Sequence, residues 1–295
     1  ALAAPAIRAS GGAMSFARRQ QGGPVVRGFI GLGLAVFVLW SAAPVVWLVL
    51  SSLLEQQALI SQPPDVSPAS FTFDNFVQVL SAAAALGRGI VNSAIVALFS
   101  TAVALALGAP AAYALARLPV PRANGIAFLI LATQMLPGIA IAIPLFIAIS
   151  RLGMIDNVLS LGVVYLSFNL PIVVWILRGF FQGIPVGIER AAAVDGAGVM
   201  ATFWHIVLPI SIPPMAAAAV FAFVEAWNEF FFALILTRQE AQTVPLVIAQ
   251  FAGQYQTVFG QMMAAAVISV APVIVLAIVF RNQIVRGFAD GITKG

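Results

Sequence analysis

With 62% of its 295 residues hydrophobic and only 8% charged, the chain has too few charged groups to cover a soluble globule, in which about a quarter of residues are charged. The net charge of +4 could suit nucleic acid, but the basic residues flank apolar stretches and form no basic stripe, which argues against a nucleic-acid partner. The absence of cysteine excludes disulfides and thiol catalysis. We therefore expect membrane lipid to surround most of this protein.

The first residues differ in composition from the rest of the chain. Residues 1–27 are rich in Ala, Gly and Arg and show no apolar periodicity, which predicts a disordered cytoplasmic segment. The apolar run that follows is too long for the core of a signal peptide. We therefore predict two parts, this segment and a transmembrane domain over residues 28–295.

Six apolar stretches are long enough to cross a hydrocarbon layer, which takes about 20 helical residues each. Each of them must be helical because lipid offers the backbone no hydrogen-bond partner. We therefore expect an all-α membrane protein with six transmembrane helices. Their expected places are between Arg27 and Glu55, Arg88 and Arg117, Arg122 and Arg151, and Asp156 and Arg178, from Leu208 through Glu225 and Glu229, and from about Gln261 to Arg281.

The prolines within these spans allow two interpretations. Pro137, Pro144 and Pro171 could be kinks that the membrane tolerates, which is the interpretation we favour, or they could mark broken helices that line a path.

The positions of the basic residues predict the topology. With a cytoplasmic amino terminus, only Arg88, Arg151 and Arg238 among the Lys and Arg residues fall on the external side. Cytoplasmic segments of membrane proteins carry the excess of Lys and Arg. Both termini are therefore expected in the cytoplasm. The first external segment should hold a short amphipathic helix from Asp74 to Leu80, with Phe71, Phe73 and Phe76 on the membrane surface.

The largest cytoplasmic loop, at about residues 179–207, predicts two short helices. Pro185 suits a first helical turn, and Gly196 is the residue type that ends a helix in a left-handed conformation. The second helix should run to Leu208, where Pro209 redirects the chain into the fifth span. Its apolar positions share one face by helical periodicity and are Val199, Phe203, Ile206 and Val207.

This loop resembles the EAA loop of permease subunits of binding-protein-dependent ABC importers. The matching positions are Ala191, Ala192, Gly196, Ile206, Leu208 and Pro209, whereas Arg190 stands where the family has Glu, with Glu189 one residue earlier. The chain is also similar to the maltose-type second permease of sugar importers in the segments FTFDNF (71–76), NS (92–93), AAYALAR (111–117), QMLPG (134–138) and AWNEF (226–230), and in its tail (284–295).

The resemblance implies a type I ABC importer permease fold and a role as half of the sugar path of an ATP-driven importer in the bacterial inner membrane. It implies as partners a homologous permease, two ATPase subunits and an extracytoplasmic solute-binding protein. The loop would be a coupling helix that sits in a cleft of the ATPase. The residues implied in that coupling are Glu189, Arg190, Ala191, Ala192, Asp195, Gly196, Ile206, Leu208 and Pro209.

Nucleotide and metal chemistry are not expected in this chain. A P-loop needs a Gly-Lys-Ser/Thr sequence, and the only lysine is Lys294, so ATP and magnesium should bind to the separate ATPase. His205 is the only histidine, and we interpret it as structural. We therefore expect no enzyme activity, no metal site and no cofactor in this chain.

A few polar residues within the spans are candidates for the substrate path. Glu225, Asn228 and Glu229 would border its external mouth, although an earlier end of the fifth span would make both acids interfacial. Gln134 and Asn169 suit sugar hydroxyls, and hydrogen bonding between helices is the equal alternative. An ion-coupled secondary transporter remains the alternative function, although charged relays in several spans are lacking.

Overall fold

The computed structural model describes residues 24–81, 83–253 and 258–292, so residues 1–23, predicted to be disordered, lie outside the described part. Helix α2 (Pro24–Ser52) begins at Pro24, and proline is favourable in a first helical turn. Within it the apolar span runs from Gly28 to Ser52, and the domain boundary at residue 28 stays a prediction. The chain divides into two compact units, Ala1–Leu50 and Ser51–Gly295. Apart from α2, the helices described below belong to the second unit.

The described part of the second unit is helical and contains one isolated bridge, between Leu54 and Phe71. Its helices in chain order are α3 (Gln56–Ile60), η1 (Pro68–Ser70), α4 (Asp74–Ser81), α5 (Ala83–Arg117), α6 (Ala123–Ala132), η2 (Thr133–Met135), α7 (Gly138–Arg151), α8 (Val158–Gly183), α9 (Val186–Val194), α10 (Val199–Thr202), η3 (Phe203–Val207), α11 (Leu208–Ile210), α12 (Ile212–Asn228), α13 (Phe231–Leu236), α14 (Val244–Ala249) and α15 (Phe259–Ile292).

Four single helices and two bent helix pairs, all within the described residues, are apolar and long enough to cross a membrane. The single helices lie within α2, α5, α8 and α15, and each bent pair supplies one more span. The prediction of six spans is therefore confirmed when each pair counts as one. The fourth span continues to Gly183, so the predicted start of the cytoplasmic loop at residue 179 falls inside α8.

The third span is broken rather than kinked, which corrects the favoured interpretation of Pro137. Ala123–Met135 and Gly138–Arg151 meet at an angle of 88°. Leu136 is extended at the break because a residue before proline is pushed out of the helical region. Pro144 and Pro171, by contrast, lie inside the continuous helices α7 and α8.

The fifth span is bent by 75° between Val199–Ile210 and Ile212–Asn228. The chain turns at Ser211, whose hydroxyl donates a hydrogen bond of 2.5 Å to the Val207 carbonyl. Pro209 lies within α11, so the turn comes two residues later than expected. Part of the preceding turn is a π-helix, η3.

Helices α5 and α8 pack along each other, and α12 packs against both of them and against α15. Two glycines permit the close approach of α5 to α8. A Cβ added at Gly108 would lie 2.8 Å from Val173 Cγ1, and one added at Gly162 would lie 2.5 Å from Phe99 Cδ1. Small residues let membrane helices approach closely, and van der Waals packing then holds them together.

The short helix α4 is present as predicted, but it is not simply a surface helix. Asn75 is buried, and its Nδ2 donates to the carbonyls of Ser52 at 3.0 Å and Leu54 at 2.9 Å. Val79 is buried in an apolar cluster with residues of α15, and Phe76 packs against that cluster. Only Phe71 and Phe73 of the three expected aromatics are exposed.

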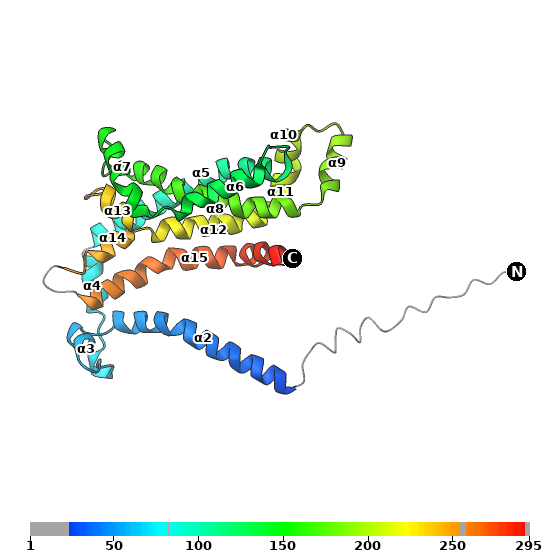
Figure 1. The fold of residues 1–295 in the computed structure, drawn as a ribbon. Helices are drawn as coiled ribbons and strands as arrows, with labels where there is room; N and C mark the ends of the chain where they lie inside the picture. Colours follow the sequence, from blue (N-terminus) through cyan, green and yellow to red (C-terminus); the bar gives the residue numbers. More distant parts are fainter. Residues whose placement is uncertain (1–23, 82, 254–257, 293–295) are drawn as a thin grey trace. The chain divides into compact units, whose positions relative to one another are not determined.

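The second unit has two ends that differ in content. Helices α9, α10 and α11 lie at one end, while α4, α7, α13 and α14 lie at the other (Figure 1). The long helices α5, α8 and α12 run between these ends (Figure 1). The candidate coupling residues therefore lie at one end, and Glu225, Asn228 and Glu229 lie toward the other.

Candidate functional site

Helix α9 ends at Val194, and Gly196 terminates it in the left-handed conformation that the sequence predicts. Gly196 has a φ of +84°, its N–H donates to the Ala193 carbonyl at 3.1 Å, and the Ala197 N–H donates to the Ala192 carbonyl at 2.9 Å. This pair of hydrogen bonds around a left-handed residue is the Schellman motif, which satisfies the last carbonyls of a helix. The left-handed conformation makes glycine the favourable residue here.

Only one narrow stripe of α9 faces the rest of the unit. Ala192 is buried and Glu189 is mostly buried. Arg190, Ala191, Asp195 and Gly196 are exposed, as are Ile188 and Val194, the latter by 87%. Most of the circumference of α9 is therefore left uncovered by the residues that the structure describes.

An ion pair fastens α9 to the end of α5. Arg117 Nε lies 3.5 Å from Glu189 Oε1, and the two side chains are only 10% and 17% exposed. These two atoms attract as charges but are not aligned as a hydrogen bond. The Arg117 guanidinium also donates to the Ile184 carbonyl, just before α9. Glu189 thus turns inward, which the sequence alone did not predict.

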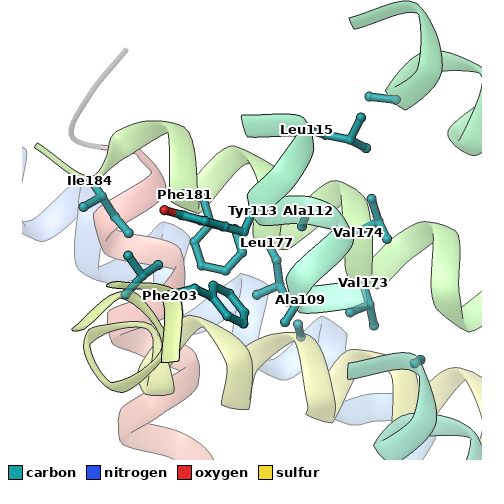
Figure 2. Close-up of a cluster of buried hydrophobic side chains, with 14 of the residues drawn as sticks. Ala109, Ala112, Tyr113, Leu115, Val173, Val174, Leu177, Phe181, Ile184 and Phe203 are labelled. Atoms are coloured by element: carbon teal, nitrogen blue, oxygen red, sulfur yellow. The ribbon is translucent and has the colours of Figure 1, made fainter. Parts of the chain in front are cut away.

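Three aromatic side chains, Tyr113, Phe181 and Phe203, pack together in the buried apolar cluster at this end (Figure 2). The Tyr113 ring of α5 lies 5.9 Å from Phe181 of α8 and 5.0 Å from Phe203 of η3, measured between ring centroids. The Tyr113 hydroxyl also interacts with the Glu189 carboxylate. The rings thus join three segments at the base of the loop, next to the ion pair.

The second loop helix is only partly as predicted. Phe203 and Val207 are buried and Ile206 and Leu208 are half-buried, so these four residues pack against the bundle. Val199, expected on the same face, is exposed by 56% at the first position of α10. Pro209 is also exposed.

His205 is exposed in this part of the loop. Its Nδ1 lies 3.0 Å from the Ala201 carbonyl, one helical turn earlier. The contact is local, and a structural role for His205 stays an interpretation.

At the other end of α12, Glu229 joins three elements. Its Oε2 accepts a hydrogen bond of 2.6 Å from the Tyr165 hydroxyl of α8, and its Oε1 accepts one of 2.9 Å from the Phe232 N–H in the first turn of α13. The Ala233 N–H donates to Oε2 at 3.3 Å. Glu229 thus caps α13 and ties it to α8.

Glu225 and Asn228 differ from Glu229 in exposure. Both are exposed, and α12 ends at Asn228. Glu225 therefore lies in the last turn of the helix, with its side chain exposed. A role of all three residues at the mouth of the path stays a prediction.

Gln134 and Asn169 both make contacts between helices. Gln134 Nε2 donates to the Phe168 carbonyl at 2.8 Å, at the break of the third span. Asn169 is 0% exposed, and its Nδ2 donates to Ser100 Oγ of α5 at 3.1 Å. Asn169 Oδ1 is buried without a hydrogen-bond partner. In this conformation Asn169 is shut within the α5–α8 contact, so a contact with substrate stays a prediction.

Asp156 organises the loop between α13 and α14. Its two carboxylate oxygens accept hydrogen bonds from the N–H groups of residues 238–241 at 2.9–3.1 Å. Partial burial raises the pKa of Asp156, but these four backbone donors outweigh it and lower the pKa from 3.8 to about 2. The ionised carboxylate therefore holds the loop in place.

The same loop is fixed to α5 by two adjacent side chains. Asn92 Nδ2 donates to the carbonyls of Glu240 at 2.7 Å and Gln242 at 2.9 Å, and Ser93 Oγ accepts from the Val244 N–H at 2.9 Å. Arg88 and Glu240 add an exposed ion pair of 3.3 Å. The loop thus links α5 to the segment between α7 and α8.

The family model described as binding-protein-dependent transport system inner membrane component matches residues 104–290, which include the whole loop that carries α9 and α10. The chain belongs to this family. It is therefore an inner-membrane component, and the family is one of transport permeases rather than of enzymes.

The permease is similar to several characterised relatives over most of its length. It is 33% identical to the trehalose transport system permease protein SugB of Mycobacterium tuberculosis, over 87% of this chain and 93% of that protein. It is 33% identical to the trehalose/maltose transport system permease protein MalG of Thermococcus litoralis, over 85% and 91%. It is 31% identical to the diacetylchitobiose uptake system permease protein NgcG of Streptomyces coelicolor, over 90% and 89%.

A solved structure shares the fold of the permease. It is the crystal structure of a bacterial ABC transporter involved in the import of the acidic polysaccharide alginate, matched with a TM-score of 0.69 at 21% identity. The match covers 87% of this chain and 96% of that one. The expected type I importer permease fold is thereby confirmed.

Three residues of the permease that anchor its two ends were not predicted as site residues. Arg117, Asn92 and Ser93 lie in the AAYALAR and NS segments, which were noted only for their resemblance. Asp156 and Tyr165 stood in no such segment. Their partners lie more than 60 residues away in sequence, so no local pattern reveals the contacts.

Proposed function

We propose that this chain is a permease subunit of an ATP-driven carbohydrate importer, in which it forms half of the translocation path. The names of its relatives support a carbohydrate substrate, because trehalose, maltose and diacetylchitobiose permeases each match more than four fifths of the chain. The family description supports a solute-binding protein as a partner. One homologous permease and two ATPase subunits complete the proposed complex, and both termini lie in the cytoplasm.

The observation that carries the mechanism is the way α9 stands on the bundle. It presents an exposed surface outward and is fastened inward to α5 by Arg117 and Glu189. An ATPase subunit that grips α9 would therefore move the end of α5 together with α8 and α12. Rigid movement of packed helices about a site is a known route to alternating access. We propose this lever for ATP-driven opening of the path.

The five residues predicted for the substrate path divide into two groups, those that border the path and those that position its helices. Glu225 and Asn228 are exposed at the end of α12 and are the residues best placed to border the external mouth. Glu229, Gln134 and Asn169 make contacts between helices here. We propose that these three shape the path by positioning helices.

Reconstitution in lipid vesicles tests the function. The chain, its partner permease and the ATPase subunit are inserted together, and uptake of labelled trehalose and maltose is measured with and without ATP and the solute-binding protein. We expect uptake only when ATP and the binding protein are both present. Uptake that follows an ion gradient without ATP would contradict the proposal and favour a secondary transporter.

Topology is tested separately, because the chain has no cysteine of its own. Cysteine is introduced at Val194 on α9 and at Leu152 in the opposite loop, both strongly exposed. A membrane-impermeant maleimide added outside intact cells should label the Leu152→Cys variant and not the Val194→Cys variant. The reverse labelling would overturn the assignment of α9 to the cytoplasm.

A further inference from the structure

The two adjacent charges on α9 point to different partners. Glu189 lies on the inward stripe and pairs with Arg117, as described above. Arg190 is exposed, and among the described residues it has neither an ion pair nor a hydrogen bond. Successive residues of an α-helix point about 100° apart, so the two side chains leave the helix in different directions.

The surroundings of Arg190 are apolar or small. The other exposed residues of α9 are Val186, Gly187, Ile188, Ala191, Ala193 and Val194. The only acidic residue of α9 is Glu189, which is engaged, and Asp195 follows the helix at its capped end. The outward surface of α9 therefore offers a partner one cation surrounded by apolar contact area.

We infer that the ATPase subunit presents a carboxylate to Arg190 within an apolar cleft that receives α9. This inference rests on the proposed function, because it takes the ATPase as the occupant. Arginine binds a carboxylate through two parallel hydrogen bonds, and shielding by apolar neighbours strengthens such a pair. A partner surface of positive charge would instead be repelled.

Affinity measurements test the charge complementarity. The solubilised permease pair is titrated with the purified ATPase subunit, and Arg190→Glu is compared with Arg122→Glu. Arg122 is also exposed, lies in the loop before α6 and makes no described ion pair. We expect Arg190→Glu to weaken binding by about tenfold or more, and Arg122→Glu to change it by less than about twofold.

Cross-linking identifies the carboxylate directly. The Arg190→Lys variant carries a reactive amine in place of the guanidinium, and a carbodiimide joins an amine to a carboxylate only where they are in contact. We expect an amide link between the introduced amine and an Asp or Glu of the ATPase subunit, located by mass spectrometry. Links confined to this chain, or no link at all in a complex that holds the ATPase, would overturn the inference.

The results separate this inference from the proposed function. If the unaltered permease does not bind the ATPase subunit, the proposed function fails together with the inference. If it binds and Arg190→Glu binds equally well, only the inference fails. Measurement at 50 mM and 500 mM salt adds a second readout, because a charge pair should weaken with salt in the unaltered protein and not in the variant.

Discussion

The hydroxyl of Tyr165 donates a 2.6 Å hydrogen bond to Oε2 of Glu229, and this contact joins α8 to the point where α12 gives way to α13. The same carboxylate accepts from two N–H groups in the first turn of α13. A negative charge is favourable at a helix start, and hydrogen bonds to a charged acceptor are the stronger ones. Glu229 is therefore a residue that holds the end of the span.

We predict that Glu229→Gln destabilises the permease, while Glu225→Gln does not. The amide keeps one acceptor oxygen and no charge, so the loss should be about 1.5–3 kcal/mol. Glu225 is exposed in the last turn of the same helix and serves as the matched control. The thermal unfolding of both variants in detergent checks this, and equal unfolding temperatures would contradict the role of Glu229.

Transport assays of the exposed pair examine the mouth of the path. We expect Glu225→Gln and Asn228→Ala to raise the KM for sugar uptake by about fivefold, the value of one hydrogen bond, at an unchanged unfolding temperature. Unaltered uptake by both variants would remove these residues from the path. Uptake is measured in vesicles at several concentrations of the loaded binding protein.

Breaking the ion pair between Arg117 and Glu189 should uncouple ATP hydrolysis from transport. In Glu189→Gln, Arg117 keeps its bond to the Ile184 carbonyl but loses its charged partner, so α9 is held less firmly to α5. We expect the ATPase subunit still to bind and hydrolyse ATP while uptake per ATP falls about tenfold, a loss of about 1.4 kcal/mol in coupling.

A charge exchange separates attraction from packing in this pair. The double variant Arg117→Glu, Glu189→Arg should recover part of the coupling, because the charges again attract, but not all of it, because the bond to Ile184 is lost. If uptake per ATP in the double variant is no higher than in either single variant, the attraction between the two charges does not contribute to coupling.

Substitution of Gly196 should affect docking of the ATPase rather than membrane insertion. The φ of +84° disfavours any side chain by about 1–2 kcal/mol, although no atom lies within 4 Å of an added Cβ. We expect Gly196→Trp to insert normally and to lose the co-purifying ATPase, and Gly196→Asn, which tolerates this conformation, to retain it. Retention of the ATPase by Gly196→Trp would refute this prediction.

Acid should loosen the loop between α13 and α14 through Asp156. Its pKa in the folded protein, about 2, lies below the ordinary value of 3.8, so the carboxylate stabilises the fold above about pH 4. That stabilisation disappears as the pH falls from 3.8 through 2. We expect Asp156→Asn to unfold at a lower temperature than the unaltered protein at pH 6, and the difference to shrink at pH 2.5. If the difference in unfolding temperature does not change with pH, the charge of Asp156 is not what stabilises the loop.

The sequence predicted the spans and the ends of α9 well, because both depend on local physical rules. Uncharged stretches must be helical in lipid, and Pro185 and Gly196 start and stop a helix by their own conformational limits. The break at Leu136 also has a local cause, because a residue before proline is disfavoured in the helical region. The proline after Leu136 signalled it, but proline in a membrane helix more often causes a kink.

The partners of the site residues could not be predicted in the same way. Arg190 occupies the motif position, yet Glu189 is the residue that faces α5, and only the rotation of α9 on the bundle decides between them. Asp156 likewise meets backbone groups about 80 residues along the chain, which carry no side-chain signal. Contacts of this kind depend on tertiary packing, so they require the three-dimensional structure.

The separation of duties between neighbouring residues on α9 bears on how such importers diversify. Glu189 keeps the loop attached to its own bundle, so a substitution at Arg190 leaves that attachment intact. If the ATPase subunit binds α9 as proposed, Arg190 can change to suit a different ATPase surface while the attachment of α9 to α5 stays as it is.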